Sequence, residues 1–373
     1  MSATESSRAA DAPPAADALA DRATMDEQIR VVTDHAARIF LWNYDRSRPQ
    51  LVTLYNKAAA GQWNGLTDLD WSIDVDPERM AATQADPNPI RLIAEEAVSL
   101  PGSPIASWGE RELTQLGIEI LKAQLSQFMH GEQGAMMVAA KIVETVPWID
   151  ARYYAATQTM DEARHTEVFA RYLHEKLGDA YPMSPFLENQ VMALIEDSRW
   201  DVAYLGMQIV IESLALAAFG GMLRNATEPL LKKLLRYVIA DEARPVAFGV
   251  LSLSEYYADL SEAELKDRQD ILLDATINNR ARNTTPEVWE RMGVGPEVFP
   301  FLKEAAARRG GSVDSGFVAN FYAKLVPNVR KLGLLDANDG YLRERWGAAG
   351  LLRFEGSADT ADDYDTYAIG ADA

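Results

Sequence analysis

The feature that most constrains this chain is a short acidic motif that occurs twice. The first copy comprises Glu132, Glu162 and His165, and the second comprises Glu212, Glu242 and Pro245. Each position of the second copy lies 80 residues after its counterpart, as the pairs 132/212, 162/242 and 165/245 show. A repeat of this kind predicts two helical hairpins of the same design, each with one Glu on its first helix and one on its second.

The segments that carry the motifs are predicted to be long helices. From about Ser107 to Tyr257 the sequence is rich in helix-forming residues, and prolines divide it into four parts. We predict helices over about 107–145, 148–178, 186–225 and 228–258. Each is longer than the roughly 11–12 residues of a mean globular helix, and four such helices predict a bundle.

Further helices are predicted outside this region, at about 25–44, 261–279, 285–292, 298–309 and 315–328. The stretch 62–90 contains prolines, acids and two tryptophans without periodicity, so we expect an ordered loop packed by its tryptophans. No segment has the alternation that is typical of strands. The predicted fold class is therefore all-α, a four-helix bundle with additional flanking helices.

Each repeat Glu is the centre of an apolar stripe, as Leu205, Ile209, Leu216 and Phe219 are around Glu212. A lone E-x-x-H pair is usually a solvated pair on a helix surface. Several carboxylates on apolar faces, however, are costly in a core unless they are paired or bind a cation. The chain has no Cys, and a site built from carboxylates and imidazole suits iron or manganese.

Two Glu from two helices and an E-x-x-H motif from each of the other two form the ligand set of the di-iron carboxylate bundles. The candidate metal ligands are Glu132, Glu162, His165, Glu212 and Glu242. We expect no catalytic residue separate from these ligands. The other histidines offer no replacement ligand, because His130 and His174 lie off this helical face and His35 is distant in the sequence.

The run HGEQGAMM…YYAATQTMDEARHTEVFARYL…LGMQIVIESLALAAF…DEARPVAFGV resembles the bacterial di-iron oxygenases related to p-aminobenzoate N-oxygenase. The resemblance covers roughly residues 107–258, and its motifs are specific for the superfamily rather than for the substrate. It implies a ferritin-like bundle with two Fe ions that activate O2 and oxidise a small organic substrate, often at nitrogen. It also implies an electron donor, which the sequence does not identify, and a homodimer.

Two departures from the family pattern concern the second half of the repeat. Pro245 stands where the family has a His ligand, and proline cannot ligate a metal. Val238 stands where p-aminobenzoate N-oxygenase has an additional His, which weakens the case for oxygenation of an aryl amine. A site with one Fe, a mixed Fe/Mn site, and a single-metal or metal-free protein without oxygenase activity therefore remain alternatives to a di-iron oxygenase or oxidase with a degenerate second half-site.

Side chains around the ligands are also predicted. Asp161 and Asp241 precede the motif Glu in each copy, and a metal-bound His usually donates its other N–H to a carboxylate or carbonyl. By pseudo-symmetry we expect Asp241 to orient His165 across the bundle, with Arg164 and Arg244 neutralising the two Asp. The alternative is that these are surface ion pairs.

Apolar residues on the same faces are candidates for a substrate cavity, although each is more often plain core: Phe128, Met129, Met136, Phe169, Leu216 and Phe219. An apolar or aromatic substrate would suit them. A radical-generating subunit like that of ribonucleotide reductase is disfavoured, because Phe169 stands where such subunits place a tyrosine. Ferritin-type iron storage is disfavoured by the length of the chain and by its flanking segments.

The charge balance excludes some partners. The chain has 56 Asp and Glu against 36 Lys and Arg, for a net charge of -20. So acidic a surface argues against nucleic acid and against anionic lipid. We also expect no membrane span, no secretory signal and a cytoplasmic location.

We divide the chain into five segments. They are a disordered tail (1–24), N-terminal helices with the ordered loop (25–106), the ferritin-like bundle (107–258), C-terminal helices that pack on it (259–355) and an acidic disordered tail (356–373).

Overall fold

The computed structural model describes residues 35–82, 88–278, 285–310 and 315–358, and within these ranges the chain forms helices and no strand. The predicted all-α fold class is confirmed. Both predicted tails lie largely outside the described residues, and the division into five segments stays a prediction.

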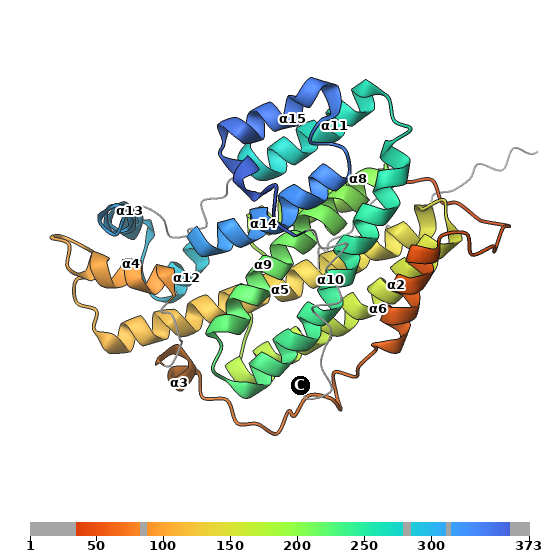
Figure 1. Ribbon diagram of the computed structural model, residues 1–373. Helices are drawn as coiled ribbons and strands as arrows, with labels where there is room; N and C mark the ends of the chain where they lie inside the picture. Colours follow the sequence, from red (N-terminus) through yellow and green to blue (C-terminus); the bar gives the residue numbers. More distant parts are fainter. Residues whose placement is uncertain (1–34, 83–87, 279–284, 311–314, 359–373) are drawn as a thin grey trace, which may run out of the picture.

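Four helical rods form the bundle (Figure 1). The first two are α5 (Glu110–Thr145) and α6 (Ile149–Tyr172), which pack along each other. The third consists of α8 (Trp200–Tyr204), η2 (Leu205–Ile211) and α9 (Glu212–Asn225) in direct succession. The fourth is α10 (Pro229–Tyr257), which packs against α9, η2 and α6.

The local sequence explains where these helices begin. The carboxylate of Glu228 accepts hydrogen bonds from the N–H groups of Leu230 and Leu231, and Pro229 then occupies the first turn of α10, where its missing N–H is not needed. At the start of α5, the side chain of Glu112 accepts from the N–H of Gly109. The predicted helix boundaries at these points agree with the structure to within a few residues.

The helix predicted over 186–225 is wrong as a single element. The structure has α7 (Pro185–Glu196), a break at 197–199, and then the third rod of the bundle. The carboxylate of Asp197 accepts from both the backbone N–H and the guanidinium of Arg199. This local turn competes with helical hydrogen bonding and explains the break.

The segment η2 is a π-helix of seven residues that ends immediately before Glu212. π-Helical turns inside longer helices are rare and occur frequently at functional sites. On the facing helix, a Cβ added at Gly249 would lie 2.6 Å from the Cβ of Gln208. Glycine therefore lets α10 approach η2 closely at Gln208.

The helix predicted over 25–44 is wrong where it can be compared. Residues 25–34 lie outside the described residues, and residues 35–44 are not helical. This segment instead crosses the end of α5, where the N–H of Ile39 donates to the carbonyl of Glu144 at 2.9 Å and Arg38 pairs with the same residue. The first described helix, α2 (Pro49–Ala60), packs on α6.

The predicted loop over 62–90 is ordered for most of its length, with two short helices nearby. Trp63 is buried, and Trp71 donates from Nε1 to the carbonyl of Gly65 at 2.6 Å. The loop leads into α3 (Pro77–Ala82), residues 83–87 lie outside the described residues, and α4 (Pro89–Val98) follows. The loop thus runs beside the bundle and delivers Trp63 into its interior.

The remaining helices surround the bundle, as the sequence predicts for most of them. They are η1 (Leu173–Leu177), α11 (Glu262–Leu273), η3 (Asp274–Asn278), α12 (Pro286–Arg291), η4 (Pro296–Val298), α13 (Phe299–Arg308), α14 (Ser315–Lys331), α15 (Ala337–Ala348) and η5 (Leu351–Phe354). Figure 1 shows α11, α14 and α15 together on one side, and α4, α12 and α13 near one end of α5.

The third rod of the bundle is the most apolar part of the described chain. Trp200–Asn225 is long and apolar enough to cross a membrane by length and composition alone. However, 78% of its most apolar window is buried inside the protein. Packing in the core of the bundle accounts for this apolarity.

Candidate metal centre

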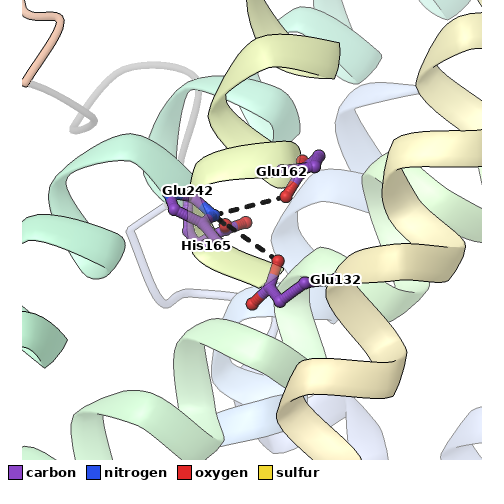
Figure 2. Close-up of side chains that lie close together, drawn as sticks. All are labelled: Glu132, Glu162, His165 and Glu242. Atoms are coloured by element: carbon purple, nitrogen blue, oxygen red, sulfur yellow. Dashed lines mark ion pairs between the residues drawn. The ribbon is translucent and has the colours of Figure 1, made fainter. Parts of the chain in front are cut away.

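Four residues of the repeat meet in the interior of the bundle (Figure 2). Glu132 comes from α5, Glu162 and His165 from α6, and Glu242 from α10. Each offers one potential ligand atom, and these atoms all lie within 4.8 Å of one another. All four side chains are buried, with at most 5% of the residue surface exposed.

The imidazole of His165 is central to this group. Its Nδ1 lies 2.8 Å from Oε1 of Glu242, 3.3 Å from Oε2 of Glu162 and 3.5 Å from Oε2 of Glu132. Three helices therefore direct carboxylates at one nitrogen. Groups that bind the same cation approach one another to about these distances, since each metal–ligand bond is roughly 2.0–2.2 Å long.

Several atoms of the group have no hydrogen-bond partner among the described residues. They are Oε2 of Glu162, Nδ1 of His165 and both carboxylate oxygens of Glu242. Buried polar atoms are almost always satisfied in proteins, and an unpaired buried carboxylate is costly. A cation among these atoms would satisfy them, and carboxylate oxygens with one imidazole fit iron or manganese.

The protonation of His165 is set from its other side. Nε2 lies 3.0 Å from Oδ2 of Asp241, so the contact expected between these two residues is present. Hydrogen bonds from His165 and charges on the nearby Arg side chains outweigh burial and hold the pKa of Asp241 below its usual range. Because an ionised carboxylate only accepts hydrogen bonds, Nε2 carries the proton of the neutral ring. Nδ1 is then left with a lone pair that faces the three Glu.

Two arginines connect the two Asp of the repeat. Nη2 of Arg164 lies 2.5 Å from Oδ1 of Asp161 and 3.0 Å from Oδ2 of Asp241. Nη2 of Arg244 lies 3.4 Å from Oδ2 of Asp161 and also pairs with Asp241. Both Asp are buried, so the alternative of surface ion pairs is wrong.

The loop before α3 completes this network with residues that sequence reasoning missed. Nε1 of Trp63 donates to Oδ2 of Asp241 at 2.7 Å, and Nε2 of Gln62 donates to Oδ1 of Asp161 at 2.7 Å. Arg164 lies over the Trp63 ring at 4.7 Å from its centroid. No periodic pattern marks loop residues, and the QWNGLTDLDW stretch itself was the only available signal.

Burial dominates the acid–base behaviour of the carboxylates. It raises the pKa of Glu132 well above its usual range, and the charge of Glu242 adds to the effect. The pKa of Glu162 is raised for the same two reasons. For His165, burial alone would lower the pKa, but the hydrogen bond to Asp241 and the close approach of the three Glu carboxylates to Nδ1 raise it well above its usual value.

The structure places Glu212, the fifth candidate ligand, beside this group rather than within it. It is buried on α9, and burial followed by repulsion from Glu242 and Glu162 raises its pKa well above the usual range. Its Oε1 lies 3.4 Å from Nε2 of Gln158, which also donates to Oε1 of Glu162 at 3.0 Å. A side-chain amide thus lies between two candidate ligands.

Pro245 lies inside α10, which continues through it, and it is buried. As the sequence predicts, this position offers no imidazole to the second half of the repeat. His130 is directed elsewhere, with Nε2 at 2.9 Å from the carbonyl of Tyr181. His35 and His174 are exposed.

The apolar residues proposed to line a cavity form packed core near the site. The ring of Phe128 lies 4.7 Å from that of Phe219 and 5.9 Å from that of Phe169. Phe169, Phe219 and Leu216 are buried in one hydrophobic cluster, with Phe128 and Met129 packed against it. Met136 is partly buried. This packing agrees with the alternative that these residues are plain core.

No protein-family model and no curated protein matches the chain. Among solved structures, it is similar to R2-like ligand-binding oxidases with reconstituted Mn/Fe cofactors. A single-residue variant with an aerobically reconstituted cofactor gives a TM-score of 0.46 at 15% identity, over 78% of this chain and 93% of that chain. A second structure, after a long soak, gives 0.45 at 15% identity, over 78% and 92%. At these values the likeness assigns neither a family nor a chemistry to this chain.

Proposed function

We propose that this chain is a metal-dependent oxidoreductase that uses O2 to oxidise a small organic molecule. Iron or manganese would be held by Glu132, Glu162, His165 and Glu242. The observation that carries the proposal is the convergence of unpaired carboxylate oxygens and one imidazole Nδ1 in a buried bundle interior. A purely structural core would gain stability by replacing such groups with apolar side chains.

When bound there, iron or manganese would supply the one-electron chemistry that reactions of O2 require. The protein's own residues prepare the site for it. Asp241 fixes the His165 ring through Nε2 and so directs the Nδ1 lone pair at the carboxylates. Arg164 and Arg244 pair with both Asp and help to hold the pKa of Asp241 below its usual range, and burial keeps bulk water from the carboxylates.

The finer expectations from the sequence stay predictions. N-oxygenation of an amine, relation to p-aminobenzoate N-oxygenase, an external electron donor, a homodimer and a cytoplasmic location all come from sequence reasoning or from the resemblance. The packed Phe128, Phe169 and Phe219 cluster supports an apolar surrounding for the site without naming a substrate.

The second candidate is a single-metal or metal-free bundle without oxygenase activity. Pro245 favours it, because the second half of the repeat lacks the imidazole that completes the first. The two candidates differ in one measurable property, which is whether the metal-loaded protein consumes O2 when it is reduced.

The test compares Glu162→Ala with Glu167→Ala. Glu167 is on the same helix but is exposed, so its substitution controls for the loss of a carboxylate from α6. Each protein is loaded anaerobically with Fe(II) or Mn(II), freed of unbound metal by gel filtration and analysed for metal per chain. The reduced Fe(II)-loaded protein is then exposed to O2, and consumption is followed with an electrode.

We expect the wild type and Glu167→Ala to retain metal and consume O2, and Glu162→Ala to lose both properties. Equal metal content in the two variants would reject the ligand assignment. Retained metal without O2 consumption in the wild type would reject the oxidoreductase and leave the second candidate.

A further inference from the structure

Two glutamines lie one helical turn before two of the glutamates. Gln158 precedes Glu162 by four residues on α6, and Gln208 precedes Glu212 by four residues across the junction of η2 and α9. Both are buried, with 1% and 0% of their surface exposed. Residues at this spacing share one face of a helix, so each amide lies on the same side of its helix as its Glu.

The two amides bind each other across the bundle. Nε2 of Gln208 donates to Oε1 of Gln158 at 2.7 Å, and Nε2 of Gln158 lies 3.2 Å from Oε1 of Gln208. The pair is therefore fixed on both helices. Gly249 contributes, because the absence of its side chain lets α10 close directly over Gln208.

Gln158 also lies against one oxygen of each of two Glu that a second metal would need. Its Nε2 lies 3.0 Å from Oε1 of Glu162 and 3.4 Å from Oε1 of Glu212. Glu162 is thereby divided between two environments. Its Oε1 accepts from the amide, whereas its Oε2 has no partner and faces Nδ1 of His165.

The atoms without a hydrogen-bond partner consequently gather around His165. They are both oxygens of Glu242, Oε2 of Glu162 and Nδ1 of His165, whereas Glu212 is outside the group whose ligand atoms converge within 4.8 Å. The second half-site has Pro245 in place of an imidazole and has amide donors beside its carboxylates. An N–H group that points at a carboxylate oxygen occupies one of its lone pairs and places the positive end of its dipole where a second cation would bind.

We propose that the side-chain amides of Gln158 and Gln208 close the second half-site of the repeat, so that each chain binds one metal ion, held by Glu132, Glu162, His165 and Glu242. The inference rests on the proposed function only in requiring that this first half-site binds metal. The repeat and the resemblance predict a site with two iron ions. The inference predicts one metal ion instead and attributes the missing ion to Gln158 and Gln208.

The test counts metal ions in four proteins: the wild type, Pro245→His, Gln158→Ala, and the double variant with both substitutions. Each is titrated anaerobically with Fe(II), and metal per chain is measured by elemental analysis after gel filtration. Retention of the first ion reports that a variant still folds around its site. Circular dichroism of each variant checks that the helical bundle is intact.

We expect one ion per chain for the wild type and for both single variants, and two for the double variant. Pro245→His alone restores the imidazole but leaves Gln158 across Glu162 and Glu212. Two ions in the wild type, or two in Pro245→His alone, would overturn the inference. One ion in a folded double variant would also overturn it, because removal of the amide would then not have opened the second half-site. No ion in the wild type would instead contradict the proposed function.

Discussion

Asp241→Asn is the perturbation that most directly tests how the site is built, because the repeat supplies its own control in Asp161→Asn. Both carboxylates are buried, and each contacts both Arg164 and Arg244. Only Asp241 also contacts Nε2 of His165, at 3.0 Å. The two variants therefore share one structural loss and differ in a second.

The shared loss concerns stability. Either substitution leaves two buried guanidinium groups with a single carboxylate, and breaking a buried ion pair in this way costs about 3–5 kcal/mol. We expect the free energy of unfolding of the metal-free protein to fall by a similar amount in Asp241→Asn and Asp161→Asn. Urea unfolding followed by circular dichroism measures both.

The second loss concerns metal affinity. Oδ2 of Asp241 accepts from Trp63 and Arg164 as well as from His165, whereas Oδ1 accepts from Arg244. An amide at position 241 therefore keeps its oxygen towards His165 and turns its NH2 group towards Arg244. The His165 ring keeps an acceptor but loses the negative charge that makes its Nδ1 a stronger ligand. Loss of such support lowers metal affinity about 10–100-fold, or about 1.4–2.7 kcal/mol.

Competition between each protein and a chelator of known affinity for Mn(II) gives the two dissociation constants. We expect a 10–100-fold weakening in Asp241→Asn and little change in Asp161→Asn. Equal affinities in the two variants would refute the support that the charged Asp241 gives to His165 as a ligand, whatever their stabilities.

Two further predictions concern the same network. Trp63→Phe removes the 2.7 Å hydrogen bond from Nε1 to Asp241 and should lower the free energy of unfolding by about 1.5–3 kcal/mol. Trp71→Phe should cost less, because its lost hydrogen bond goes to a neutral carbonyl. Equal losses in urea unfolding would contradict this prediction. In the metal-free protein, the pKa values of Glu132 and His165 are raised, so the folded state keeps protons that the unfolded chain releases. The free energy of unfolding should therefore fall as the pH rises from about 4.5 through 6.5 and beyond. Added Mn(II) should make this fall less steep, because the metal replaces the protons. A free energy of unfolding that rises over this pH range in chelator-treated protein would contradict the prediction.

The helices of the bundle could be predicted because their ends depend on local chemistry. A proline in the first turn and a capping side chain begin α10, and these signals can be read without knowledge of the rest of the chain. Residues 35–44 show the opposite case. Their helix-forming composition is overridden by contacts with the end of α5, at Glu144, which lies about 100 positions further along the chain.

The four residues that converge in the bundle could be predicted because they lie on regular helices and their carboxylates recur with the repeat. The residues that surround them could not be predicted in the same way. Trp63 and Gln62 belong to a loop whose path no periodicity describes, although they contact Asp241 and Asp161 directly. Loop residues reach a site through the tertiary path of the chain, which spacing arguments do not contain.

The repeat itself also hid one feature, since it favours the assumption that both halves are equivalent. A shift of 80 residues relates Phe128 to Gln208 and Gln158 to Val238, and each of these residues lies one helical turn before one of the four Glu. In each related pair one residue is polar and the other is apolar. The structure follows this difference, with Phe128 and Val238 packed in or against a hydrophobic cluster and the two Gln bound to each other and to the carboxylates. Pro245 is thus one of several differences between the two ends of the site, and the duplicated ligand pattern surrounds a centre whose two halves are chemically different.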